Sequence, residues 1–263
     1  MSALELEGRR TLIGMVHLLP LPGAPRYGGD FEAVLRAARR DAEALAAGGV
    51  DAVLIENWGD APFRPTVWPE TIAAMARVVG ELARVAPLPL GVNCLRNDAR
   101  AALGLLATGE ASFLRVNVHV GAAVTDQGLV EGRAWETLRE RARLAPGAKL
   151  FADLEVKHAR PLAWRPLVEE ALDTARRGLA DALVFSGAAT GAPPALEDLA
   201  EVRSALPATP LFVGSGFDAT NGAGLLAHAS GAIVGTALKH DGDVDAPVDV
   251  ARVRALRLLF DEA

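Results

Sequence analysis

The sequence contains one cysteine and three lysines, and it lacks a long uninterrupted apolar run although 51% of its 263 residues are hydrophobic. The single cysteine, Cys94, excludes an intramolecular disulfide framework and fits a reducing, cytoplasmic environment. Its apolar surroundings favour a small buried residue over a nucleophile. No stretch approaches the ~20 apolar residues of a membrane-spanning helix and no signal-type segment is present, so we expect no membrane span.

An excess of positive charge is also missing. The chain has 27 Lys and Arg against 33 Asp and Glu, a net charge of −6, and no block of basic residues. Nucleic acids and anionic membranes attract concentrated positive charge, so both are poor candidate partners. The three lysines are Lys149, Lys157 and Lys239, and the last two lie near the carboxyl ends of predicted strands.

Short β-rich runs alternate with helix-period segments along the whole chain. The predicted strands cover residues 11–17, 51–57, 88–93, 112–118, 149–156, 181–187, 209–216 and 231–238. Amphipathic segments follow them, as in 31–49, where Val34, Ala38, Ala42 and Leu45 fall on one helical face. Repeated strand–helix units of about thirty residues predict an α/β fold, a single-domain (β/α)8 TIM barrel over residues 1–263. An open, doubly wound sheet with insertions is the alternative.

The predicted connections differ between the two ends of the strands. Links from a helix to the next strand are tight, whereas links from a strand to the next helix are long and polar, as in 18–30, 58–70, 119–132 and 240–249. Active sites of (β/α)8 barrels are built on the loops at the carboxyl ends of the strands. The sequence therefore predicts a functional site on that rim.

Polar side chains stand at many predicted strand ends, and they meet in one place if the barrel closes. They are His17, Glu56, Asn57, Asn93, Arg115, Asn117, His119, Asp153 and Ser186. In "FADLEVKH" (151–158), alternation puts Asp153, Glu155 and Lys157 on one side, in phase with Phe151, where they can face the mouth of the barrel. A structural ion pair at this strand end is the alternative, and Asn93 or His119 taken alone fits a structural hydrogen-bonding role.

Small residues follow the last two predicted strands. Gly214, Ser215 and Gly216 follow the seventh, and Gly235 and Thr236 lie in the eighth. Small residues let backbone N–H groups approach an anion, and phosphate sites in barrels often form from these two loops. We therefore predict a phosphate site here, with tight turns alone as the alternative.

No metal-binding motif is present. "DGDVD" (241–245) begins like a calcium loop, but Ala246 and Arg252 stand where an EF-hand needs Gly and Glu. His17, Glu56, Asp153 and His158 are metal-ligand types without the spacing of a known zinc motif. We predict no cofactor, and a divalent metal stays an open alternative.

Seven segments, in this order, resemble the BtpA/SgcQ family. They are "IGMVHLLPLPGAP" (13–25), "GVDAVLIENWGDAPF" (49–63), "NVHVGAAVTDQGLVEG" (117–132), "ADLEVKHA" (152–159), "FSGAATGAPP" (185–194), "VGSG" (213–216) and "GTALKHDG" (235–242). The resemblance spans residues 13–257 and implies a ribulose-phosphate-binding-type barrel. It also implies an association with photosystem I biogenesis and the rim residues His17, Glu56, Asn57, Asn117, Asp153, Lys157, His158, Thr190, Ser215 and Thr236.

These features predict a cytoplasmic enzyme that acts on a small phosphorylated metabolite, a sugar phosphate or a nucleotide-like compound. Asp153, Glu56 and His17 are the catalytic candidates, with the two carboxylates as general acids or bases, and Lys157 would hold a developing oxyanion. The remaining candidates, Asn57, Asn93, Asn117, His158, Ser186 and Thr190, would contact the substrate.

Isomerisation, epimerisation, aldol-type cleavage and glycosidic hydrolysis all suit such a site. A Schiff base at Lys157 or Lys239 needs a lowered lysine pKa that neighbouring acids oppose. The rival hypothesis is a non-catalytic assembly or regulatory factor on the same barrel, and a homo-oligomer is compatible with either.

Overall fold

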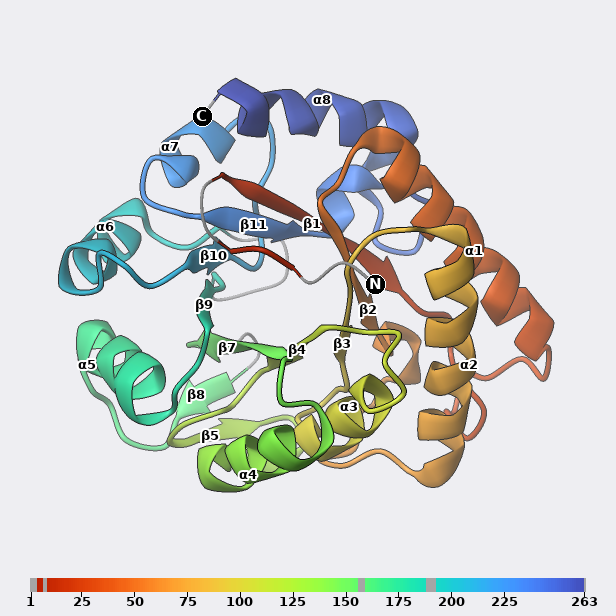
Figure 1. Ribbon diagram of the computed structural model, residues 1–263, viewed down its shortest axis with the longest axis horizontal. Helices are drawn as coiled ribbons and strands as arrows, with labels where there is room; N and C mark the ends of the chain where they lie inside the picture. Colours follow the sequence, from red (N-terminus) through yellow and green to blue (C-terminus); the bar gives the residue numbers. More distant parts are fainter. Residues whose placement is uncertain (1–3, 7–8, 156–158, 188–192, 263) are drawn as a thin grey trace.

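The barrel predicted from the alternation is present and closed. The computed structural model describes residues 4–6, 9–155, 159–187 and 193–262. Within them eight parallel strands pair in the order β1 (Thr11–His17), β2 (Ala52–Glu56), β3 (Leu90–Asn93), β4 (Phe113–Val116), β7 (Lys149–Leu154), β9 (Ala182–Phe185), β10 (Leu211–Val213) and β11 (Gly231–Val234), and β11 pairs back onto β1 (Figure 1). Closure confirms the (β/α)8 prediction and excludes the open sheet.

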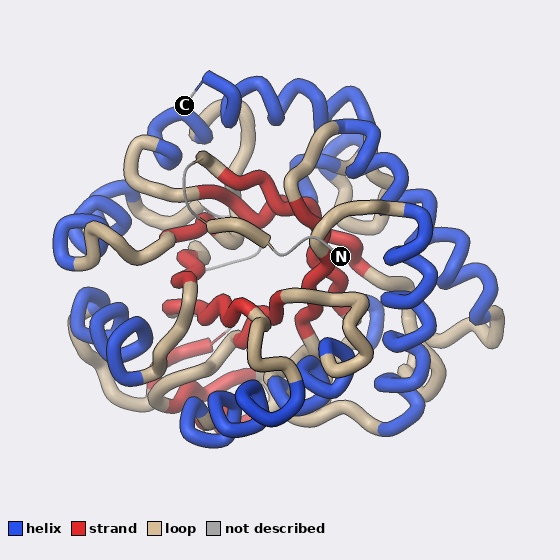
Figure 2. Tube along the Cα trace, viewed as in Figure 1, coloured by secondary structure: helices blue, strands red, loops and turns tan. Residues whose placement is uncertain are grey.

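Helices surround the barrel on its outside (Figures 1 and 2). They are α1 (Phe31–Gly48), α2 (Pro69–Val85), α3 (Ala99–Leu106), α4 (Ala134–Leu144), α5 (Leu167–Leu172), α6 (Leu196–Ala205), α7 (Gly222–Leu226) and α8 (Val250–Glu262). Shorter turns are η1 (Trp58–Asp60), η2 (Asp173–Arg177), η3 (Thr236–Leu238) and η4 (His240–Gly242). In the described parts of the chain no helix combines the length and the apolar character needed to cross a membrane.

Helix α1 illustrates how the sequence sets these boundaries. The Asp30 side chain accepts a hydrogen bond from the Ala33 amide and so caps the first turn. Gly49 ends the helix with φ +90°, a conformation that costs glycine little. Between these caps Val34 and Leu45 lie on the buried face and pack into the layer between helices and strands.

The inside of the barrel is divided into an apolar half and a polar half. Phe113, Phe151 and Phe212 fill the amino-terminal half, with ring centroids 5.3 and 5.0 Å apart, and Leu4 packs into the same cluster. Two residues further along the strands, in the same inward phase, Phe113 is followed by Arg115 and Phe151 by Asp153. The amino half is therefore a packed core, and the inward-facing polar groups gather at the carboxyl end.

The strand β7 ends earlier than the sequence predicted. It stops at Leu154, and Glu155 adopts φ +49°, is exposed, and donates its amide to Glu170 Oε1 at 3.4 Å. A positive φ turns the chain out of the strand, so the predicted alternation is wrong at Glu155. Lys157 lies outside the described residues.

The polar loop predicted over 119–132 contains regular structure. β5 (Ala122–Thr125) and β6 (Gly128–Glu131) form an antiparallel hairpin, and β8 (Ala159–Pro161) pairs with β5 to complete a three-stranded sheet. Gly128, with φ +90°, makes the tight turn, and Thr125 Oγ1 donates to its carbonyl at 3.0 Å. Each of these strands has only four residues, AAVT and GLVE, which is too short for a clear alternation signal, and this explains why the hairpin was not predicted.

Candidate active site

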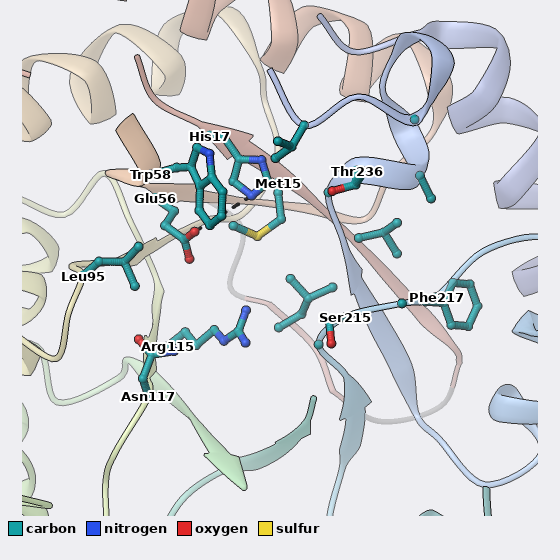
Figure 3. A pocket seen from close by; sticks show the side chains of 18 of the residues that line it. Met15, His17, Glu56, Trp58, Leu95, Arg115, Asn117, Ser215, Phe217 and Thr236 are labelled. Carbon is teal, nitrogen blue, oxygen red and sulfur yellow. Dashed lines mark ion pairs between the residues drawn. The ribbon is translucent and has the colours of Figure 1, made fainter. Parts of the chain in front are cut away.

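A pocket of 370 Å³ opens at the carboxyl end of the barrel; we call it the mouth pocket. Its lining includes these residues predicted from the sequence: His17, Glu56, Asn117, Gly214, Ser215, Gly216, Gly235 and Thr236. In Figure 3 the side chains of His17, Glu56 and Trp58 gather on one side, Ser215 and Thr236 lie across from them, and Arg115 reaches in between. The closed barrel thus brings several strand ends to one cavity.

Glu56 and His17 form the acidic side of the mouth pocket. The strands β1 and β2 pair His17 with Glu56, and their side chains approach within 3.9 Å, His17 Nε2 to Glu56 Oε1. Asn93, paired with Glu56 across β2 and β3, donates to Glu56 Oε2 at 3.0 Å. A carboxylate and an imidazole held together beside a cavity can take up and return a proton during a reaction.

Arg115 and Asp153 form a buried ion pair at the centre of the mouth. Arg115 donates to Asp153 through Nε (2.7 Å to Oδ1) and Nη2 (2.9 Å to Oδ2), and Asn117 Nδ2 donates to Oδ2 at 2.9 Å. The side chains of Arg115 and Asp153 are 4% and 0% exposed. Within the described residues Arg115 Nη1 has no hydrogen-bond partner. Asp153 thus holds the guanidinium of Arg115 in place. One edge of this guanidinium faces the mouth pocket, which Arg115 lines.

The surroundings of this pair keep its arginine charged. Burial alone would lower the pKa of the Arg115 guanidinium, but the negative charges of Asp153 and Glu56 and the hydrogen bonds to Asp153 outweigh it and raise the pKa. Arg115 therefore stays positively charged at any physiological pH. It offers a fixed positive charge to an anionic ligand or to an oxyanion that forms during a reaction.

The predicted phosphate loops form the wall opposite Glu56. Gly216 adopts φ +65°, and within the described residues the amide N–H groups of Gly216 and Thr236 donate no hydrogen bond. A Cβ added at Gly235 would lie 2.6 Å from His17 Cε1, and one at Gly214 would lie 3.1 Å from Arg115 Nη2. Glycine at these positions lets the imidazole and the guanidinium lie directly against the loop backbone.

The sequence profile of the BtpA family matches residues 8–261. The chain belongs to the BtpA family. The Photosystem I biogenesis protein BtpA of Synechocystis sp. is 47% identical over 250 residues, covering 95% of this chain and 87% of the relative. An uncharacterized protein of Thermococcus kodakarensis is also 47% identical, over 94% of both chains.

A solved structure supports the fold and no more. The N-(5'-phosphoribosyl)anthranilate isomerase from Pyrococcus furiosus superposes with a TM-score of 0.59 at 10% identity, covering 97% of this chain and 100% of the isomerase. Such a likeness at low identity places this BtpA-family chain among (β/α)8 barrels, and it assigns no function.

A second cavity in this BtpA-family chain lies beside the mouth pocket and is lined by other residues that the sequence predicted. It measures 450 Å³ and is lined by residues of β5 and β8, of the end of β7 and of α5; we call it the flank pocket. Asp153 and Ser186 line it, and Asn117 lines both cavities. Asn93 lines neither of them, and its contact with the site runs through Glu56.

Asn57 is placed away from the ligand space. Its amide donates to Asp60 Oδ2 at 3.0 Å and to the Leu95 carbonyl at 3.3 Å, and its oxygen accepts from the Leu95 amide at 2.7 Å. Its hydrogen bonds therefore brace the turn after β2, and the structure does not bring it to the pocket as predicted. The candidates Lys157, His158 and Thr190 lie outside the described residues.

Lys239 does not contribute to the mouth pocket of the barrel. It is buried in the loop after β11, where Val248 pairs with it in an isolated bridge, and it lines neither the mouth pocket nor the flank pocket. Burial lowers the pKa of its ammonium group, and the charge of Asp41 acts in the opposite direction. A Schiff base at this position has no access to a ligand in the mouth pocket.

Several mouth residues were not among the predicted candidates. They include Met15, Trp58, Phe63, Leu95, Arg96 and Asp126, together with Arg115, which the sequence placed at a strand end but which received no role. Asp126 lies at the tip of the β5–β6 hairpin, so its place follows from the strands that were missed. Trp58 lies two residues after the end of β2, and an aromatic residue just beyond a barrel strand is the available signal.

The described residues hold no cluster of metal ligands. In residues 4–6, 9–155, 159–187 and 193–262 no group of three or more His, Cys, Asp or Glu side chains is arranged to hold a metal ion. Glu56 and His17 approach each other without a third such ligand in that part of the chain.

We expect Cys94 to be unreactive in the native protein. It is buried against Met75, and burial strongly raises the pKa of its thiol, so the nucleophilic thiolate is scarce. A colorimetric disulfide reagent at pH 8 should modify Cys94 only after denaturant is added. Rapid modification without denaturant would contradict the buried placement.

Proposed function

We propose that this BtpA-family barrel is an enzyme that acts on a small phosphorylated metabolite in the mouth pocket. The phosphate is bound by Gly214–Gly216 and by Gly235–Thr236, and Glu56 with His17 transfers a proton. Arg115 stabilises negative charge on the substrate. Lys157, outside the described residues, keeps its predicted role of holding an oxyanion in this proposal.

The role of Asp153 changes with the geometry. The sequence suggested Asp153 as a general acid or base, but both its oxygens accept hydrogen bonds from Arg115 and Asn117. Glu56 accepts a hydrogen bond from Asn93, lies beside the imidazole of His17 and lines the mouth pocket itself. We therefore propose Glu56 for proton transfer and Asp153 as the residue that positions Arg115.

The observation that carries the proposal is the set of buried charges at the mouth. Glu56, Arg115 and Asp153 are each 6% exposed or less, and burying charged groups is costly even when they are paired. A barrel needing only stability could fill these positions with apolar residues, as it does one layer below at Phe113 and Phe151. Such a cost at a strand-end cavity is typical of an active site.

The reaction class follows from the chemistry of these groups. An acid/base pair beside a fixed cation supports proton abstraction next to a carbonyl, which underlies isomerisation, epimerisation and aldol-type cleavage. Hydrolysis of a glycosidic bond would use only the proton transfer by this pair, because its oxocarbenium-like transition state is positively charged and Arg115 would not stabilise it. Each of these reactions forms an anionic or proton-transferring transition state within reach of Glu56, His17 and Arg115.

The first test of the proposal measures ligand binding, and turnover is measured afterwards. Ribose 5-phosphate and inorganic phosphate at ~100 times their Kd should add about 2.7 kcal/mol to the free energy of unfolding, read as a rise in Tm. In Gly235→Ala the new methyl group pushes against His17, and we expect phosphate affinity to fall at least about tenfold.

The matched control is Gly224→Ala in α7, where an added Cβ meets nothing within 4 Å. This variant should bind as the parent protein does. Equal affinity in both variants would show that the glycine loops do not bind phosphate. Absence of any shift with all phosphorylated compounds would argue against the proposed substrate class.

A non-catalytic assembly or regulatory role is the second candidate. The Synechocystis relative is named for photosystem I biogenesis, and apolar side chains are exposed around the β5–β6–β8 sheet. Val124 and Leu129 pair across β5 and β6 with 49% and 53% exposure, and Trp164 is 82% exposed. If this exposed face binds a partner or a second copy of the chain, replacing Val124 and Leu129 with Thr should weaken that association. If the barrel is only an enzyme, the same variant should keep its turnover.

A further inference from the structure

The mouth pocket has two chemically different ends. The glycine loops after β10 and β11 present backbone amides and small side chains at one end, near Thr236. The other end carries the apolar surfaces of Trp58, Phe63 and Leu95, and the charged residues Glu56 and Arg96 are their neighbours in the lining. In Figure 3 Trp58 and Leu95 lie on the side away from Ser215 and Thr236. A ligand made only of phosphate and hydroxyl groups would leave these apolar surfaces without an apolar partner.

Trp58 is held in a fixed position at that end. It begins η1, two residues after the end of β2, and its ring contacts the His17 imidazole with centroids 5.3 Å apart and planes 37° from parallel. The turn that carries it is braced by Asn57, which bonds to Asp60, and Asp60 accepts from the Leu21 amide at 2.8 Å. A fixed aromatic ring loses little entropy when a ligand stacks on it, so it is suited to bind a flat ring.

His17 connects the two ends of the pocket. One side of its imidazole contacts Trp58, and the other side approaches Gly235, whose missing Cβ would lie 2.6 Å from Cε1. Only one imidazole ring therefore separates the aromatic surface from the phosphate loop after β11. A ligand that reaches both ends needs a short spacer, of the size of a sugar ring, next to His17 and Glu56.

On the basis of the proposed function, we infer that the substrate carries a planar aromatic or heteroaromatic ring that stacks on Trp58, joined through a short spacer to the phosphate. The class is that of nucleoside monophosphates and related ring-bearing phosphates, as opposed to open-chain or simple sugar phosphates. The volume of 370 Å³ lies within the range of about 300–1,000 Å³ for small-molecule sites.

The test compares ligands that differ only in the ring. Adenosine monophosphate, uridine monophosphate, ribose 5-phosphate and adenosine are titrated into the protein by calorimetry. We expect one of the two nucleotides to bind at least about tenfold more tightly than ribose 5-phosphate, because stacking of a base on an aromatic side chain contributes about 1–3 kcal/mol. Of the four tryptophans, all in the described part of the chain, Trp58 alone lines the mouth pocket, so binding should also quench its fluorescence.

Variants of Trp58 then assign the effect. Trp58→Leu should weaken nucleotide binding at least about tenfold more than it weakens binding of ribose 5-phosphate, while Trp58→Phe, which keeps a ring, should retain most of the preference. Trp135→Leu is the matched control, since Trp135 is 63% exposed on α4 and lines neither the mouth pocket nor the flank pocket. The Tm of each variant confirms that it is folded.

The outcomes separate the inference from the proposed function. Equal affinity for ribose 5-phosphate and both nucleotides, or equal weakening of all ligands in Trp58→Leu, overturns the aromatic ring but keeps phosphate binding. If adenosine binds as tightly as adenosine monophosphate, stacking on Trp58 is supported and the proposal that the glycine loops bind a phosphate group is overturned. Absence of binding by all four compounds overturns both.

Discussion

Replacing Glu56 with glutamine is expected to lower the turnover number by about 100- to 10,000-fold while the protein stays folded and still binds its ligand. Glutamine has the same shape, and its amide oxygen can still accept the hydrogen bond from Asn93 Nδ2. It cannot take up or release a proton at neutral pH. The loss therefore falls on kcat, and the ligand Kd changes little.

The measurement follows product formation by phosphorus NMR, using the compound from the binding panel that the parent protein converts. Glu43→Gln is the matched control, since Glu43 is exposed on α1 and pairs with Arg39 at 2.8 Å. This control should keep full turnover. Full turnover in Glu56→Gln would exclude Glu56 as the proton-transfer group and return that role to His17 or to Lys157.

Much of the site was predictable because barrel strands impose a period of two on the sequence. His17, Glu56, Arg115 and Asp153 each stand two residues after an inward-facing apolar residue, so their direction follows from alternation alone. The positions of the two glycine loops follow from the order of the strands. These features depend on local sequence and on the closure of the sheet.

The pairing of charges was not predictable in the same way. Arg115 and Asp153 are 38 residues apart, and their contact depends on the neighbouring positions of β4 and β7 and on two side-chain rotamers. Asn57 looked like a rim residue, but its rotamer turns the amide toward Leu95 and Asp60. Alternation along a strand predicts which side chains face the barrel interior. The chemical role of each side chain depends on contacts like these, which alternation does not predict.

Replacing Asp153 with asparagine is expected to lower the free energy of unfolding by about 3–5 kcal/mol, because it leaves the buried Arg115 charge without its partner. Arg115 donates two of its hydrogen bonds to Asp153, and both side chains are almost fully buried, so water compensates little for their loss. Urea denaturation followed by circular dichroism measures the change. The exposed Glu43→Gln variant should leave the free energy of unfolding nearly unchanged.

The double variant Arg115→Met with Asp153→Asn separates structure from chemistry. It removes both charges of the pair, and the asparagine side chain introduced in place of Asp153 can still accept from Asn117, so most of the lost stability should return. Ligand affinity should not return, because the guanidinium edge facing the mouth pocket is gone. Recovery of both properties together would mean that the ion pair only maintains the fold. Recovery of stability alone would mean that this buried ion pair serves ligand binding, although burying it lowers the free energy of unfolding.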